Sequence, residues 1–262
     1  MKHYIKIYLK LLQLSWATLI IYRSNFLNSI LSSLVWSFFN IFAIVVLTSR
    51  TSSVFGWTRN ELITLVACSN ILLGMFYFLF SPNFYTFSQI VNLGKLDSIL
   101  IKPLDSQFAI SLWQSSYQSL SRTIFGIIVV CFMLSQMHLH ITLFTIIMFL
   151  CLLLFGLVLQ YSIWFSVITL TMWFTTLSNL NDLLYNTNDF ARFPPEMFRG
   201  GKELLYFIIF PFTLIVVVPV KSLLQKATVV DIFVLFLVTG IFFYFSRKFF
   251  QFALRFYTSA SG

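Results

Sequence analysis

The sequence predicts an all-α integral membrane protein with a single transmembrane domain, residues 1–262. Hydrophobic residues make up 59% of the chain and charged residues only 10%, against roughly 25% charged residues in a soluble domain. The apolar runs are also continuous, whereas the strands of a membrane barrel alternate weakly over segments of about ten residues. Since a helix needs about 20 apolar residues to cross a bilayer, we expect about six spans joined by short loops.

The first segment, residues 1–24, is expected to be an amphipathic helix at the membrane surface. Lys2, Lys6 and Lys10 recur every four residues among Tyr, Ile, Leu and Trp. This pattern is typical of a helix that lies in the plane of an anionic leaflet. The apolar run that follows starts too late and is too long for a cleaved signal peptide. We therefore expect the segment to stay in the mature protein.

The next two apolar runs predict a helical hairpin, with spans at 26–48 and 61–80. The stretch 81–107 then breaks the hydropathy and predicts a short amphipathic helix. Its first residues, Ser81 and Pro82, favour a helix start, and Gly94 favours a left-handed cap at the end. Inside this helix, one apolar face is formed by Phe84, Phe87, Ile90 and Val91.

The third span, 110–135, must include polar residues, because its apolar part is too short to cross a bilayer alone. The polar positions Ser111, Ser115, Gln118 and Arg122 follow one stripe at helical spacing. A charge such as Arg122 is costly in lipid, so the stripe should face protein or water. Two interpretations stay open, namely helix packing through small polar residues and a water-filled pathway.

The chain after residue 141 fits two layouts. In one, a single long helix from 141 ends in a cytoplasmic Asn-rich segment, and 203–220 is the fifth span. In the other, the fourth span is 141–160, the chain turns near Gln160 to Ser162, and 163–182 returns as a polar fifth span. Residues 204–224 are then re-entrant and interrupted by Pro211 and Pro219, a course tolerated only under protein cover. In both layouts 230–246 is the last span.

Basic residues near span ends predict the orientation. In either layout more of them fall on the side that holds both chain ends, so both termini and the 81–107 helix should be cytoplasmic. The residues on that side in both layouts are Lys2, Lys6, Lys10, Arg23, Lys95, Lys102, Arg247, Lys248 and Arg255.

The motifs of common enzymes are missing from the sequence. It has no phosphate-binding loop, no zinc-protease motif and no nucleophile elbow, and no metal cluster surrounds His138 and His140. The three cysteines, Cys68, Cys131 and Cys151, lie in apolar runs and are expected to be small buried hydrophobes. Proton-driven carriers usually need a carboxylate inside a membrane span, and no apolar span of this sequence contains one. We expect a non-catalytic protein with no bound cofactor, whose energy comes from elsewhere.

One motif carries a family resemblance. The run Gly94, Lys95, Leu96, Asp97, Leu100, Lys102 and Pro103 resembles the "G-x-L-D-x-x-L-x-[KR]-P" signature after the second span of permease subunits in type-2 exporters of the ATP-binding-cassette class. A second similarity lies at Phe193-Pro194, Phe210-Pro211 and Pro219. Together with the six-span plan, the resemblance covers nearly the whole chain.

The resemblance implies a permease subunit in a bacterial cytoplasmic membrane, paired with a second permease, identical or homologous. Two separate ATPase subunits would dock on the cytoplasmic side and hydrolyse ATP. The helix after the second span would be the coupling helix, and its ATPase contacts would be Phe84, Phe87, Gln89, Ile90, Gly94, Lys95 and Asp97. The resemblance also favours the re-entrant layout, with the Asn-rich segment beside a pathway. That pathway would be lined by Ser111, Ser115, Gln118, Arg122 and Asn179.

Two other functions fit the same spans. A passive channel would use the polar stripe without any ATPase, and a membrane scaffold would bind partners without transport. The substrate is not specified by the sequence, since apolar walls suit lipids, peptides, drugs or glycans.

Overall fold

The computed structural model describes residues 2–21, 23–50, 53–137, 139, 141–174, 180–198 and 203–257. Within these residues the chain is an all-α integral membrane protein with a small β-hairpin, and six of its helices are long and apolar enough to cross a bilayer. In chain order the elements are α1 (Lys2–Ile21), α2 (Arg23–Leu47), β1 (Ser53–Val54), β2 (Trp57–Thr58), α3 (Arg59–Leu79), α4 (Ser81–Asn92), α5 (Asp97–Leu100), α6 (Ser106–Ser111), η1 (Tyr117–Ser119), α7 (Leu120–Gln136), α8 (Leu143–Thr169), η2 (Leu170–Met172), α9 (Leu180–Thr187), η3 (Asn188–Arg192), η4 (Pro195–Phe198), α10 (Glu203–Leu223) and α11 (Val229–Ala253).

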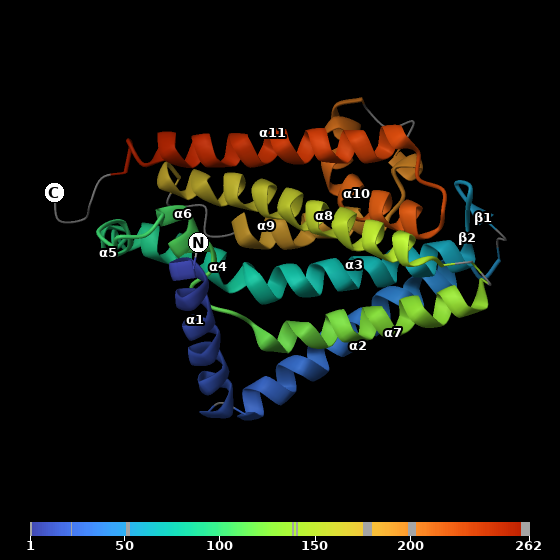
Figure 1. Ribbon diagram of the computed structural model, residues 1–262, viewed down its shortest axis with the longest axis horizontal. Helices are drawn as coiled ribbons and strands as arrows, with labels where there is room; N and C mark the ends of the chain where they lie inside the picture. Colours follow the sequence, from blue (N-terminus) through green and yellow to red (C-terminus); the bar gives the residue numbers. More distant parts are fainter. Residues whose placement is uncertain are drawn as a thin grey trace.

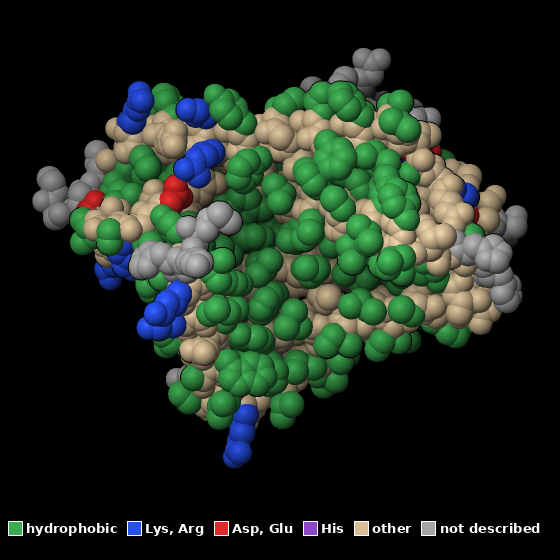
Figure 2. Space-filling view, in the orientation of Figure 1, with side chains coloured by type: hydrophobic (Ala, Val, Ile, Leu, Met, Phe, Trp, Pro, Cys, Tyr) green, Lys and Arg blue, Asp and Glu red, His purple; other side chains and the backbone are tan. Residues whose placement is uncertain are grey.

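The helices α3, α7, α8 and α11 run roughly along one axis and give the bundle two distinct ends, while α2 crosses them obliquely (Figure 1). The α4 end carries α4, α5 and α6 and is where α11 finishes. The hairpin end carries the β1–β2 hairpin and is where α3, α8 and α11 begin. Hydrophobic side chains cover the middle of the face seen in Figure 2, while most of its visible Lys and Arg side chains gather at the α4 end. This distribution suits an apolar belt in lipid with its basic end in water.

The first helix, α1, runs across the bundle axis instead of along it (Figure 1). Its length and composition would allow it to span a membrane, but none of Tyr4–Ile21 is buried inside the structure. It is held to the segment before α7, where the Tyr117 hydroxyl donates to the Leu12 carbonyl at 3.1 Å and the Tyr4 and Phe108 rings meet edge to face at 4.9 Å. A crosswise apolar helix with exposed lysines fits the expected position at the membrane surface.

The third helix, α3, is the centre of the bundle, and every residue from 61 to 74 is buried. Its hairpin-end half packs in an aliphatic core with α8 and α10. Its other half ends in an aromatic core at the α4 end, where Phe76 and Trp164 meet at a centroid distance of 4.9 Å. The second core joins α3, α4, α8 and α11, so α4 is a packed part of the bundle.

The fourth span is one continuous helix, which corrects the expected turn near Gln160 to Ser162. The α8 helix runs unbroken to Thr169, and the three residues 160 to 162 are all buried in it. At Gly156 a side chain is excluded, because an added Cβ would lie 2.3 Å from the Ile215 carbonyl oxygen of α10. The prolines of α10, Pro211 and Pro219, lie inside a single helix and do not end it.

The chain returns across the bundle after α8, but later than the predicted 163–182 span. Residue Asn188 of η3 bonds to Trp164 in the C-terminal part of α8, where its Oδ1 lies 3.2 Å from the indole Nε1. Farther along, Glu196 of η4 reaches the hairpin end and accepts from Trp57 Nε1 at 3.3 Å. The return therefore consists of α9, η3 and η4, a broken polar course whose irregular backbone is covered by α3, α8 and α10.

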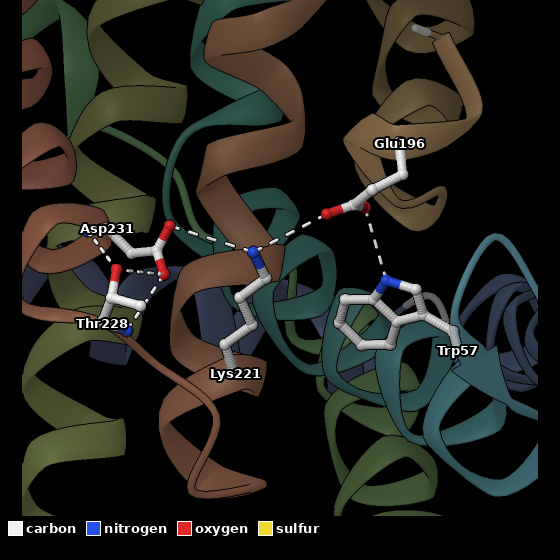
Figure 3. A network of polar contacts seen from close by, with 5 residues as sticks. All are labelled: Trp57, Glu196, Lys221, Thr228 and Asp231. Atoms are coloured by element: carbon white, nitrogen blue, oxygen red, sulfur yellow. Dashed lines mark hydrogen bonds and ion pairs between the residues drawn. The ribbon is translucent and has the colours of Figure 1, made fainter.

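A charged network at the hairpin end fixes the course of α10 (Figure 3). Lys221, near the end of α10, lies 3.8 Å from Glu196 and 3.8 Å from Asp231 at the start of α11. Glu196 and the C-terminal part of α10 therefore lie at the same end of the bundle. This contact favours the re-entrant layout over a crossing span at 203–220, and the placement of the fifth span stays a prediction.

Candidate functional site

The helix α4 begins and ends where the sequence predicts. It starts at Ser81 with Pro82 in its first turn, and Gly94 follows its end with φ +64°. The Gly94 N–H donates to the Val91 carbonyl at 3.0 Å and the Lys95 N–H to the Ile90 carbonyl at 2.9 Å. These two bonds form a Schellman cap, which requires the left-handed conformation that glycine adopts without strain.

The apolar face of α4 packs into the chain's own aromatic core. Phe84 is 0% exposed and lies against Trp164 and Phe165, and Phe87 is 1% exposed. Neither side chain can reach another protein, which corrects their expected contact with an ATPase subunit. The apolar face of α4 therefore anchors this helix to α8.

The opposite face of α4 and its continuation are accessible at the α4 end. Gln89 and Lys95 are exposed, Ile90, Gly94 and Asp97 are half-buried, and Tyr85 and Leu93 are 55% and 61% exposed. Between them Leu96 is fully buried, and its N–H donates to the Tyr257 hydroxyl beyond α11 at 3.2 Å. The site therefore presents a polar and apolar strip on a backbone that is fixed at both ends.

The Asn83 side chain connects α4 to the predicted third span by two hydrogen bonds. The Asn83 amide Nδ2 donates to the Gln114 carbonyl at 2.8 Å, and its Oδ1 accepts from the Gln114 N–H at 2.7 Å. Asn83 thus replaces the bonds that a continuing helix would make, and it is buried. The helix α6 ends at Ser111, and α7 starts only at Leu120.

This break removes the predicted polar stripe. Ser111 bonds to the Tyr161 hydroxyl of α8 at 2.8 Å. Ser115 and Gln118 turn away from the bundle and line a cavity of about 450 Å³ against α1. Ser111 and Arg122 are both buried, but they lie on different helices and face different partners, and Asn179 falls outside the described residues.

A buried polar cluster surrounds Arg122. Its Nε donates to Asn70 Oδ1 at 2.9 Å, and its guanidinium carbon lies 5.7 Å from the centre of the Tyr77 ring. The Tyr77 hydroxyl accepts from Asn188 Nδ2 at 3.0 Å, and Asn188 Oδ1 also accepts from Gln160. Four elements, α3, α7, α8 and η3, therefore meet through polar groups in the interior.

Of this cluster, only Arg122 and the general position of the Asn-rich segment were expected to line a pathway. Asn70 and Gln160 lie in apolar runs, and Arg192 of η3 joins the cluster by donating to Asn40 of α2. Polar residues inside long apolar runs were the available signal, since such residues usually face the bundle interior.

The described residues show no metal centre and no disulfide. They contain no group of three or more His, Cys, Asp or Glu that could hold a metal ion. Cys68 is buried as expected, but Cys131 and Cys151 are exposed on the outer surface of the bundle, which corrects the expected burial of both. An apolar surface helix position is compatible with the small, weakly polar thiol.

Comparison with known proteins places the chain in a family. A family model described as "ABC-2 family transporter protein" matches residues 34–261, which includes α4, the polar cluster and α10. No curated protein and no solved structure gives a significant match. Because the family match covers far more than half of the sequence, the chain belongs to the ABC-2 transporter family.

Proposed function

We propose that the chain is the membrane subunit of an ATP-driven exporter and that α4 is its coupling helix. In this proposal separate ATPase subunits bind the exposed face of α4, and a second permease, identical or homologous, completes the pathway. The observation that carries the proposal is the construction of α4, which is capped, anchored on one face and accessible on the other.

The contacts of α4 support a lever that acts on several spans. Phe84 packs on α8, Asn83 holds the segment before α7, and Leu96 bonds beyond the end of α11. A push on the exposed face would therefore reach these three elements through short, buried contacts. Packed interiors transmit such displacements because they are dense and hardly compressible.

The charge distribution supports a cytoplasmic position for the α4 end. The described basic residues there include Lys102 and Lys95 beside α5, and Arg247 and Lys248 near the end of α11. Basic residues favour the cytoplasmic side of short loops. With this orientation in a bacterial cytoplasmic membrane, α4 faces the ATP-containing compartment.

The absence of an internal energy source also supports external ATPase subunits. Among the described side chains, the one buried carboxylate is Glu61, and it is paired with Lys226 at the hairpin end. A self-powered carrier usually keeps an ionisable carboxylate near the midplane. ATP hydrolysis in partner subunits, with no catalysis by this chain, fits the site better.

The experiment is an affinity purification of the tagged full chain in mild detergent. We expect ATPase subunits and a second permease to co-purify, and we expect Gln89→Ala with Lys95→Glu to lose the ATPase subunits. Arg59→Glu, an exposed change at the hairpin end, is the matched control and should retain them. A protein recovered without any ATPase would contradict the proposal and favour a passive channel or a scaffold.

A further inference from the structure

A groove separates α7 from α8 on the outer surface of the bundle. The two helices follow each other in the chain, but α7 packs chiefly on α3, whereas α8 packs mainly on α10 and α11. Figure 1 shows α3 running between them. The space that remains is a groove of about 550 Å³, with walls from α7 and α8 and a floor to which α3 and α10 contribute.

The groove has a buried floor and an open rim. On the floor, Ile71 of α3, Val130 of α7 and Leu223 of α10 are buried. At the rim, Ile127 of α7 and Leu150 of α8 are exposed. Both walls belong to helices that are long and apolar enough to cross a bilayer. The groove is therefore open towards the lipid along its rim.

The lining of the groove offers no partner for a polar ligand. None of the described residues that line it is charged. Its one hydroxyl, on Ser135, donates to the Phe132 carbonyl of its own helix at 2.7 Å. The Cys131 thiol is only weakly polar, and an extended peptide would leave its backbone groups unpaired here. The chemistry of the groove suits a hydrocarbon.

The dimensions of the groove fit one chain of a lipid. Its lining on α7 extends over residues 127–135, or about 12 Å at about 1.5 Å per residue. One leaflet of the hydrocarbon core is about 15 Å deep, half of the full thickness of about 30 Å. Leu139 and Ile141, which follow α7, carry the groove to the hairpin end. Since an apolar cavity of about 150 Å³ holds a benzene molecule, this groove has room for a longer flexible chain.

We infer that the groove between α7 and α8 binds one hydrocarbon chain of a lipid from the leaflet at the hairpin end. Because lipid tails are as apolar as the groove, close packing holds the chain in place, and an unfilled groove would leave its floor without contacts on one side. The bound chain fills the space between two helices that pack on different partners. The inference does not depend on ATPase docking, because α4 lies at the other end of the bundle (Figure 1).

The test measures the lipid that stays with the purified full chain. The chain is reconstituted with radiolabelled dioleoylphosphatidylcholine and then washed in digitonin, a detergent whose apolar part is a rigid ring system instead of a linear chain. We expect the wild type to retain labelled lipid in a stoichiometric amount. Cys131→Trp and Ile146→Trp, which fill the groove from its two walls, should lose most of this lipid.

Ile128→Trp on α7 and Cys151→Trp on α8 are the matched controls. Both positions are exposed, and neither is among the residues that line the groove. These variants should retain as much labelled lipid as the wild type. An equal loss in all four variants would overturn the inference, since the lipid would then belong to the general surface of the bundle. A wild-type chain that keeps no labelled lipid would overturn it as well.

The native thiols give a second measurement that needs no substitution. Cys131 lines the groove and Cys151 does not, although both are exposed. In the delipidated chain, added dioleoylphosphatidylcholine should slow the alkylation of Cys131 by N-ethylmaleimide in a saturable way and leave that of Cys151 unchanged. Equal protection of both thiols would contradict a specific site. A cross-link between the Cys131 residues of two chains in the membrane would make a second permease the occupant and overturn the inference.

Discussion

The substitution Gly94→Val tests whether the capped end of α4 is needed for coupling. Gly94 has φ +64°, and valine carries a Cβ that clashes in this region and is branched. The left-handed conformation costs an ordinary residue about 1–2 kcal/mol. We take about 2 kcal/mol for valine, so the capped state falls about thirtyfold relative to the frayed state.

The local assay is hydrogen exchange of the amides at positions 94 and 95, which donate the two bonds of the cap at 3.0 and 2.9 Å. We expect their exchange to accelerate by about thirtyfold, in line with the shifted equilibrium. The functional assay is the amount of ATPase co-purified per permease and, in the assembled complex, transport per ATP hydrolysed. Both should fall, since the exposed strip loses its fixed backbone.

Gly56→Val is the matched control, because Gly56 also has a positive φ, +82°, but lies in the hairpin turn at the other end. It should cost a similar amount of backbone strain and leave ATPase recovery and coupling at the wild-type level. Normal coupling by Gly94→Val, despite faster exchange at the cap, would refute the reasoning that α4 acts as a rigid lever. An equal loss of ATPase recovery and coupling in both variants would show that the effect comes from general instability of the protein.

Three further predictions concern the contacts that hold the bundle around α4 and α10. Asn83→Ala removes both bonds to Gln114 and should lower the free energy of unfolding by about 2–3 kcal/mol. Thermal unfolding in detergent measures this loss, with the exposed Asn92→Ala as the control, and equal midpoints for the two variants would contradict the role of Asn83. Gly156→Ala places a Cβ 2.3 Å from the Ile215 carbonyl and should cost about 1–3 kcal/mol, whereas Gly240→Ala, with no atom within 4 Å, should stabilise α11 by about 0.5–1 kcal/mol. Equal midpoints for the two variants, or a higher midpoint for Gly156→Ala than for Gly240→Ala, would contradict the close packing of α8 and α10. Lys221→Met leaves Glu196 and Asp231 without their shared cation and should cost about 1 kcal/mol; unfolding at different salt concentrations measures it, and a loss that does not shrink with added salt would contradict an ionic origin.

The boundaries of α4 could be predicted from the sequence because they depend on local chemistry. Pro82 favours the first turn of a helix, because its fixed φ suits that position and no N–H is needed there, and Gly94 favours a left-handed cap. The partner of its apolar face could not be predicted in the same way. Periodicity shows that Phe84 and Phe87 share a face, but an apolar face packs equally well on the same chain or on another protein.

The prediction of a polar stripe on one helix was wrong, because the break in that helix depends on a contact between residues far apart in the sequence. Spacing alone favoured one helix through Ser111 and Arg122, but the bonds from Asn83 to Gln114 join positions 31 residues apart and allow the chain to break. The predicted turn in α8 failed for a related reason. Gln160 is polar inside an apolar run because Asn188 of η3 is its partner, and that pairing is visible only in the fold.

At the hairpin end, the starts of two helices are marked in the sequence by capping boxes. Thr58 and Glu61 form a capping box at the start of α3, and Thr228 and Asp231 form one at the start of α11. Both follow the spacing T-x-x-E or T-x-x-D, which marks a helix start. The pairing of these carboxylates with Lys226 and Lys221 adds the contacts between elements that no local pattern specifies.

The docking of an ATPase subunit on the exposed face of α4 is tested most directly by cross-linking in the membrane. A single cysteine at Gln89→Cys, in a chain whose Cys68, Cys131 and Cys151 are replaced by alanine, would be treated with a short bifunctional thiol reagent. We expect an adduct with an ATPase subunit, and none from Phe55→Cys at the hairpin end, where the side chain is also exposed. An ATPase adduct from position 55 and none from position 89 would contradict the proposed orientation and the coupling role of α4.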